Sequence, residues 1–164
     1  MKFFQHGNQY VEFVGIDPFL AEIIRQIPRA ADPEDSEEAE ARLFSSPCLD
    51  NDELANDWVE LVVPELKTHF NSAVSLVEND LEEKLSASAG EDDFPYRLQI
   101  PLAHADAWLS ALNQARLVLA ARHGFTDEEL AEQFQPRLSS HRELALYQMM
   151  IYGWMQELLL TALP

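Results

Sequence analysis

The apolar C-terminal segment constrains the fold more than any other feature of the chain. Residues 144–163, LALYQMMIYGWMQELLLTAL, are apolar nearly all round a helical wheel. Such a helix cannot lie on a surface, so protein or lipid must bury it. The segment is long enough to cross a bilayer, but Gln148, Gln156 and Glu157 would be costly in lipid. We therefore expect a helix over residues 139–163 that is buried in protein, and no membrane span.

Two arrangements could bury this helix, and the sequence leaves both open. The helix either runs through the centre of a bundle or has one face covered by a second subunit. Exposed together, Met149, Tyr152, Leu159 and Leu160 would form a contiguous apolar patch of a size that soluble monomers rarely tolerate. Two-fold pairing is the commonest way to cover such a patch. We therefore expect a homodimer formed through residues 139–163.

The rest of the chain is also predicted to be mainly helical. Two short apolar runs within residues 2–14 flank Gly7 and Asn8, which is typical of a β-hairpin. Apolar residues at spacings of three and four predict helices over residues 18–27, 51–89, 102–123 and 126–134. Within residues 51–89, Pro64 indicates either a kink or a break at which a new helix starts. The fold class is therefore mainly α, a helical bundle with a small N-terminal β-hairpin. We expect one domain over residues 1–164, with the hairpin in 1–15, an acidic loop in 29–50 and motif-bearing helices in 102–164.

Residues with capping chemistry mark several predicted helix ends. Asp17 followed by proline is the pattern of an N-cap and first helical position. Gly124 stands where the helix of residues 102–123 should end, as the residue that adopts a left-handed conformation after a helix. Thr126 and Glu129 have the spacing of a capping box. These signals set the boundaries of the predicted helices.

Acidic side chains are concentrated in the N-terminal part of the chain. The net charge is −18, and residues 1–96 carry 22 acids and 6 bases. Nucleic-acid affinity comes largely from lysine and arginine, so DNA or RNA is an unlikely partner. The densest acidic stretch, residues 31–42, is expected to be a solvated loop or an exposed helix that contributes little to stability. An acidic docking patch is its alternative interpretation.

The sequence contains no recognisable catalytic motif. Phosphate-binding glycine loops, zinc-protease motifs, nucleophile elbows and calcium loops are all missing. The single cysteine, Cys48, excludes an internal disulfide, and the five histidines lack metal-ligand spacing. The N-terminus lacks the apolar core of a secretion signal. We therefore expect a cytoplasmic protein that is not an enzyme and has no catalytic residues, no cofactor and no metal.

A single arginine interrupts the apolar face of the helix over residues 102–123. Trp108, Leu112, Ala115 and Leu119 share one side of this helix, and Arg116 falls beside them. A charge in that position needs a partner, because an unpaired buried charge is strongly destabilising. The candidate carboxylates are Glu157 and Glu143 on the last helix, with Asp106 as a weaker choice. Arg116 is thus either half of a structural ion pair or a ligand-binding residue.

Three segments together resemble a known family. Residues 40–44 (EARLF), 107–124 (AWLSALNQARLVLAARHG) and 151–163 (IYGWMQELLLTAL) are similar to an uncharacterised bacterial domain-of-unknown-function family. In actinobacteria, genes of this family often lie beside that of the Clp protease adaptor. The resemblance implies a small helical protein without established catalytic residues, and the Clp proteolysis system as a possible partner. The residues that match its signature are Trp108, Leu112, Asn113, Arg116, Arg122, Trp154, Gln156 and Glu157.

Three functions are compatible with these observations. The first is a non-enzymatic regulatory or adaptor protein that acts through protein–protein contacts, as the acidic N-terminal part and the resemblance indicate. The second is a transcription regulator, in which a helix-turn-helix-like C-terminal region would direct His141, Arg142 and Gln148 toward DNA. The high negative charge argues against it. The third is a small-ligand binder built around Arg116.

Overall fold

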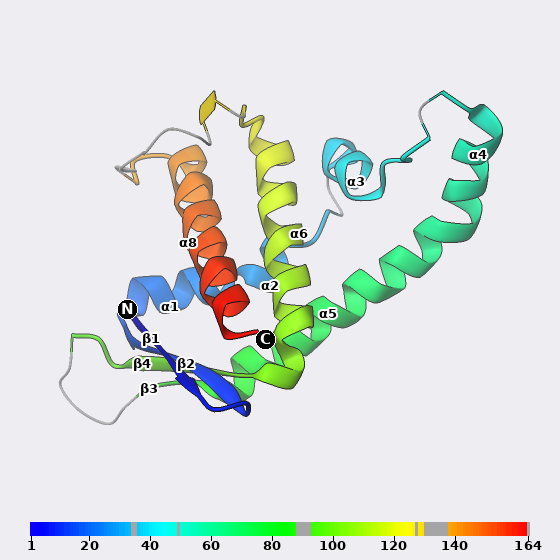
Figure 1. The fold of residues 1–164 in the computed structure, drawn as a ribbon. Coiled ribbons are helices and arrows are strands. Elements are labelled where there is room, and N and C mark those ends of the chain that lie inside the picture. Colours follow the sequence, from blue (N-terminus) through cyan, green and yellow to red (C-terminus); the bar gives the residue numbers. More distant parts are fainter. Residues whose placement is uncertain (34–35, 49, 88–92, 127, 130–137, 164) are drawn as a thin grey trace.

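The computed structural model describes the chain apart from residues 34–35, 49, 88–92, 127, 130–137 and 164 (Figure 1). Its strands are β1 (Lys2–His6), β2 (Tyr10–Ile16), β3 (Leu85–Ala87) and β4 (Tyr96–Pro101). Its α-helices are α1 (Pro18–Arg25), α2 (Ile27–Ala30), α3 (Glu37–Phe44), α4 (Asp52–Asp57), α5 (Val63–Lys84), α6 (Ala105–His123) and α8 (His141–Ala162). A π-helical turn, η1 (Trp58–Val62), joins α4 to α5, and a 3-10 turn, η2 (Leu102–His104), precedes α6. The chain is mainly helical, as predicted.

The predicted hairpin is the first half of a larger sheet. All neighbouring strands are antiparallel, and the order is β1-β2-β4-β3. Val11 lies opposite Ile100 and Phe13 opposite Leu98, and all four side chains are buried. The predicted N-terminal hairpin is therefore confirmed as β1 and β2, but the prediction did not include the four-stranded sheet to which it belongs. β2 also pairs with β4, which lies about 80 residues or more further along the chain, and that pairing buries one face of the sheet.

Helix α8 packs against the body of its own chain. It lies beside α6 over the sheet, and Tyr152, Met155 and Leu159 have no exposed surface (Figure 1). The Tyr152 hydroxyl donates a hydrogen bond to the carbonyl of Ile23 at 2.9 Å. One side of α8 is thus buried in its own chain, but Met150, Trp154 and Leu160 on the other side are exposed, so the chain does not enclose the helix as the central-helix alternative requires. The apolar patch proposed for a homodimer does not exist as predicted, because Met149, Tyr152 and Leu159 are buried and only Leu160 is exposed.

The predicted capping residues occupy their expected positions. The Asp17 carboxylate accepts a hydrogen bond from the Leu20 N–H at 2.8 Å at the start of α1. Gly124 follows α6 with a φ of 59°, in the left-handed region that glycine adopts at little cost. Thr126 and Glu129 exchange the reciprocal bonds of a capping box. The short helix predicted after Thr126 lies largely outside the described residues.

The acidic segment of residues 29–50 is more ordered than predicted. It contains α3, whose first turn is capped by the Ser36 hydroxyl accepting from the Ala39 N–H at 3.1 Å. Ala31 and Ala39 are buried, and α3 packs against α6. Residues 37–44 of the predicted loop therefore form a helix, and the alternative of an exposed helix is confirmed, because Glu37, Glu38 and Glu40 are exposed while the small Ala39 packs closely. The small contribution of residues 31–42 to stability stays a prediction. Residues 34–35 and 49 lie outside the described part.

Helix α5 runs obliquely to α6 and α8 and extends beyond the body of the molecule (Figure 1). Its C-terminal half is anchored, with Ala73, Val77, Asp80 and Leu81 as its buried residues. Its N-terminal half, η1 and α4 together form a projecting arm, residues 52–72. Residues 52–62 are all described, and none of them is buried. In the described part of the chain, no helix is long and apolar enough to cross a membrane.

Candidate functional site

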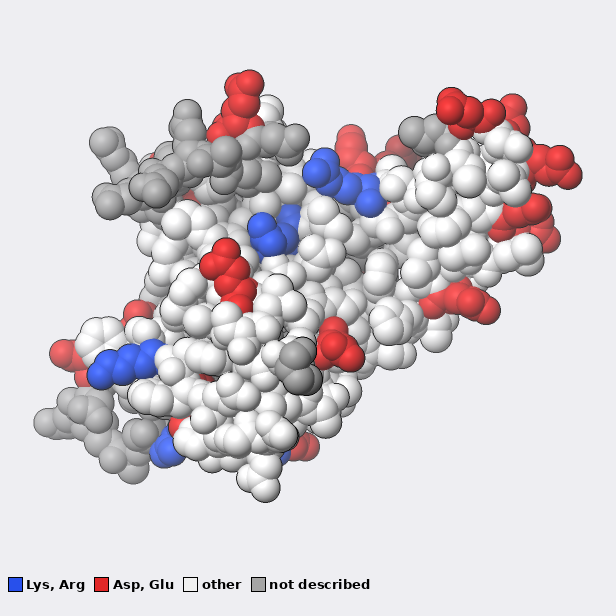
Figure 2. Space-filling view, in the orientation of Figure 1, with Lys and Arg blue, Asp and Glu red and all other residues white. Residues whose placement is uncertain are grey.

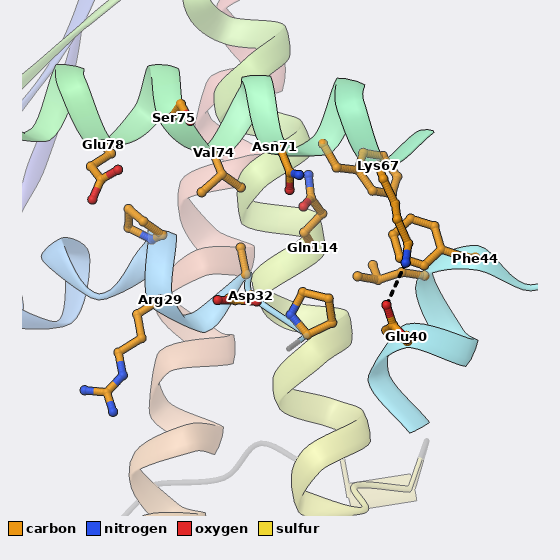
Figure 3. Close-up of a pocket in the computed structure, with 15 residues that line it drawn as sticks. Arg29, Asp32, Glu40, Phe44, Lys67, Asn71, Val74, Ser75, Glu78 and Gln114 are labelled. Carbon is orange, nitrogen blue, oxygen red and sulfur yellow. Dashed lines mark hydrogen bonds and ion pairs between the residues drawn. The ribbon is translucent and has the colours of Figure 1, made fainter. Parts of the chain in front are cut away.

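A cleft of about 640 Å³ separates the arm from the body of the molecule (Figure 3). One wall is α5, which contributes Phe70, Val74 and Ser75. The opposite wall is formed by α2 and the residues that follow it, and α6 contributes Gln114. Helix α3 lies at the outer end with Phe44. The cleft is therefore assembled from four helices, of which α5 and α6 are far from α2 and α3 in the sequence.

Contacts between α3 and the arm hold the outer end of the cleft together. The Phe44 and Phe70 rings stack with centroids 5.8 Å apart, and the Trp58 indole N–H donates to the Phe44 carbonyl at 3.1 Å. Lys67 pairs with Glu40 at 2.8 Å and lies 5.1 Å from the centre of the Phe44 ring. Both members of that ion pair are about half exposed, so it contributes little. The aromatic contacts are the main link between α3 and the arm.

The chemistry of the cleft lining is mixed. Its apolar side chains come from all its walls, and its charged groups, Arg29, Asp32, Glu40, Lys67 and Glu78, include both signs. Gln114 is 3% exposed, and its side-chain N–H donates to the Ser110 hydroxyl at 3.2 Å. Among the described residues no group of three histidines, cysteines or acids could hold a metal ion. A lining of this kind suits a segment of polypeptide better than a compact anion.

Arg116 lies between α6 and α8, and its partner is an amide. Its Nη1–H donates to Gln156 Oε1 at 2.7 Å, and Gln156 in turn donates to the Leu109 carbonyl at 3.3 Å. The Nε of Arg116 is buried and has no hydrogen-bond partner. A Cβ added to Gly153 would lie 3.4 Å from the guanidinium, so the arginine lies directly over the glycine.

The predicted carboxylate partner of Arg116 was therefore wrong. Asp106 and Glu157 are exposed, and Glu143 accepts a hydrogen bond from the Ser139 N–H at 2.7 Å at the start of α8. The cause is rotational. Adjacent helical residues point about 100° apart, so the rotation that buries Tyr152 turns Gln156 toward α6 and Glu157 toward solvent.

The other signature residues do not converge on one site. Trp108 and Leu112 are fully buried, whereas Asn113 is exposed. Arg122 donates to the Asp32 carbonyl at 2.6 Å and so links the end of α6 to the segment after α2. Trp154 packs edge-on against the Phe13 ring of the sheet at 6.3 Å. Most of the signature therefore maintains the packing of helices and sheet.

Sequence reasoning missed a buried carboxylate that links α5 to α6. Asp80 is 4% exposed and accepts hydrogen bonds from Trp108 Nε1 at 2.8 Å and His104 Nδ1 at 2.9 Å. The signal was present, because Asp80 lies on the buried helical face that Val77 and Leu81 define. Asp80 therefore links α5 to Trp108 on α6 and to His104 in the turn before α6.

Two titratable side chains near the end of α6, His123 and Glu129, have lowered pKa values. Burial lowers the pKa of His123 from its ordinary value, and the positive charge of Arg142 lowers it further. The Thr126 N–H and the Arg142 guanidinium, bonded at 2.7 Å, lower the pKa of Glu129. Arg142 also lies 4.4 Å from the centre of the Phe125 ring. These contacts connect the start of α8 to the turn that follows α6.

The sequence model of the domain-of-unknown-function family DUF2017 matches residues 8–163. The chain belongs to this family. The match includes the cleft, the arm, Arg116 and the Asp80 link, and β1 is the one described strand or helix that it leaves out. No curated protein and no solved structure matches the chain.

Proposed function

We propose that this DUF2017 protein is a non-enzymatic regulatory or adaptor protein that acts through protein–protein contacts. The observation that carries the proposal is the projecting arm. Residues 52–62 bury no side chain in the body, yet they expose Leu54, Val59 and Leu61 by 49 to 65%. Most helical stability in proteins comes from packing an apolar face. A helical arm that packs little in its own chain and keeps apolar side chains exposed is suited to contact another protein.

The cleft supports the same proposal because it adjoins the arm. A partner that contacts the arm can also reach Phe70 and Val74 in the cleft, which belong to the same helix. The mixed charges of the lining offer polar contacts at its rim. We further propose that the protein works in the cytoplasm and that its partner belongs to the Clp proteolysis system. This choice of partner is motivated by the actinobacterial genes of the family, which often lie beside that of the Clp protease adaptor.

Site-specific crosslinking tests the proposal. A photoreactive amino acid replaces Leu61 on the arm or, as a control, Phe4 on β1, which is also about half exposed. Both variants are irradiated with purified Clp components and, separately, in native lysate. We expect a discrete protein adduct from position 61 and none from position 4. Equal labelling from both positions, or none from position 61, would contradict the proposal.

A second candidate function is the binding of an anionic ligand at Arg116. It is favoured by the surroundings of the half-buried Arg116 guanidinium. Among the described residues its hydrogen-bond partner is an amide, and no carboxylate lies within 4.0 Å of it. Titration with citrate or phosphate, followed by the NMR signal of the Arg116 Nε–H, tests it. A saturable shift would support this function, whereas an unchanged signal would exclude it.

The DNA-binding alternative loses one of its proposed contacts. Gln148 is 7% exposed and donates a hydrogen bond to the Gln26 side chain at 2.8 Å, so it faces the body of the protein. Arg142 is bonded to Glu129. We therefore retain the regulatory or adaptor function as the proposal.

A further inference from the structure

The arm presents an apolar surface that the rest of the described chain leaves uncovered. We define the arm surface as the side of the arm that carries Leu54 and Leu61, with exposed fractions of 49 and 65%. The two leucines are seven residues apart, which is about two helical turns or 10 Å along the axis, so they share one side, whereas Val59 projects from another. Single exposed apolar residues are ordinary, but two leucines on one side of a projecting segment offer an apolar contact to a partner.

The charges around the arm surface have one sign. No lysine or arginine occurs between Arg42 and Lys67, and Lys67 is paired with Glu40. The acids of this interval are Asp50, Asp52, Glu53, Asp57, Glu60 and Glu65. Figure 2 shows acidic side chains gathered on the outer part of the arm, without basic ones on the face shown. The apolar residues are therefore framed by negative charge.

The backbone at the arm surface departs from a regular helix. Residues 58–62 form a π-helical turn, a rare conformation that occurs often at functional sites. Core packing does not require the π turn, because none of its five residues is buried. The turn changes the direction in which Val59 and Leu61 project from the helix. It is a feature of the arm surface itself.

We propose that the arm surface docks a basic amphipathic helix of a partner protein. The charge complementarity carries the choice of occupant. Nucleic acids, anionic membranes and the arm of a second copy are all negative, so the acids would repel them. A helix with an apolar stripe bordered by lysine or arginine would cover the leucines and pair with the surrounding carboxylates. This inference rests on the proposed function and specifies the chemistry of the partner.

Binding of a designed peptide tests the inference with the full-length protein. The probe is an 18-residue helical peptide of leucine and lysine, and its control carries glutamate in place of lysine. We expect the lysine peptide to bind, and its affinity to fall with increasing salt. In the variant Asp57→Asn/Glu60→Gln/Glu65→Gln the affinity should fall about tenfold, by loss of three exposed charge contacts. The charge-matched variant Glu22→Gln/Glu82→Gln/Glu157→Gln, altered away from the arm, should bind as the wild type does.

A second pair of variants tests the apolar contribution. Leu61→Ser should weaken binding several-fold, whereas Leu160→Ser, which alters an equally exposed leucine on α8, should have no effect. Equal weakening in the arm and control variants would show that the overall charge attracts the peptide, and would overturn the inference. Absence of binding would also overturn it. An adduct from position 61 with a partner that lacks a basic helix would refute this inference and leave the proposed adaptor function intact.

Discussion

Removal of the Asp80 carboxylate tests the link between α5 and α6. The substitution Asp80→Ala leaves the indole N–H of Trp108 without an acceptor in a position that is fully buried. An unsatisfied buried donor costs about 1 to 3 kcal/mol. The lost bond to the half-exposed His104 adds about 1 kcal/mol. We expect the free energy of unfolding to fall by about 2 to 4 kcal/mol.

Two further substitutions separate the hydrogen bonds from the charge. In Asp80→Asn the amide oxygen can still accept from Trp108, so a smaller loss of about 1 kcal/mol is expected. In Trp108→Phe the carboxylate loses its buried donor. A double-mutant cycle with Asp80→Ala and Trp108→Phe, each of which removes the bond between the two residues, should show a coupling energy of about 1 kcal/mol, because the two residues contact each other directly.

Urea denaturation followed by far-UV circular dichroism measures these effects. Glu82→Ala is the matched control, because Glu82 is exposed on the same helix, and its effect should stay within about 0.5 kcal/mol. An Asp80→Ala midpoint equal to that of the control would refute the argument. So would a coupling energy of zero, because it would mean that the Trp108 bond to Asp80 does not contribute.

Four other outcomes are expected. Arg116→Ala should lower the free energy of unfolding by only about 1 kcal/mol in urea denaturation, because it leaves the half-buried Gln156 amide, and no buried carboxylate, without its partner. A loss of 3 kcal/mol or more, by contrast, would indicate a carboxylate partner of Arg116. Gly153→Ala should be neutral or stabilising by up to about 1 kcal/mol, because the added Cβ makes an ordinary contact 3.4 Å from Arg116 and alanine favours the helical conformation. Marked destabilisation would show that α6 and α8 cannot adjust to the added methyl group. His123 has a lowered pKa in the folded state, so the unfolded state binds more protons just below pH 6.5, and the free energy of unfolding should rise with pH there. The difference in unfolding free energy between wild type and His123→Gln, plotted against pH, isolates this slope, and a flat curve would contradict the prediction. A homodimer through residues 139–163 remains a prediction, and it now depends on the exposed apolar residues of α8, which are Met150, Trp154 and Leu160. Sedimentation should show a dimer at tens of micromolar protein, and a monomer would exclude it.

Features that depend on neighbouring residues could be predicted from the sequence. Asp17, Gly124 and the Thr126–Glu129 pair were assigned correctly because capping depends on residues within one helical turn. The buried face of α6 followed from the periodicity of its apolar residues, and Leu112 on that face is fully buried. Local chemistry was sufficient in each case.

Features that depend on the relative placement of distant elements could not be predicted. The pairing of β2 with β4 joins segments more than 80 residues apart, and nothing local in either strand specifies its partner. Gln156 and not Glu157 faces Arg116 because α8 turns its Tyr152 side to the core. An almost uniformly apolar helix gives no periodic signal for that rotation. The cleft was missed for the same reason, since four separate helices form it.

The arm shows why a uniform helical pattern can conceal a change of role along one helix. Helix α5 has 22 residues, about 33 Å, but its first buried residue is Ala73. Once the C-terminal half is anchored by packing and by Asp80, extending the helix outward avoids the unfavourable nucleation step. The half-buried contact of Phe70 with Phe44 adds support from α3. The stability of the arm therefore depends on the anchored half of α5 and on α3, and its exposed leucines contribute little to it. Substitutions at Leu61 should consequently alter binding while leaving the fold intact.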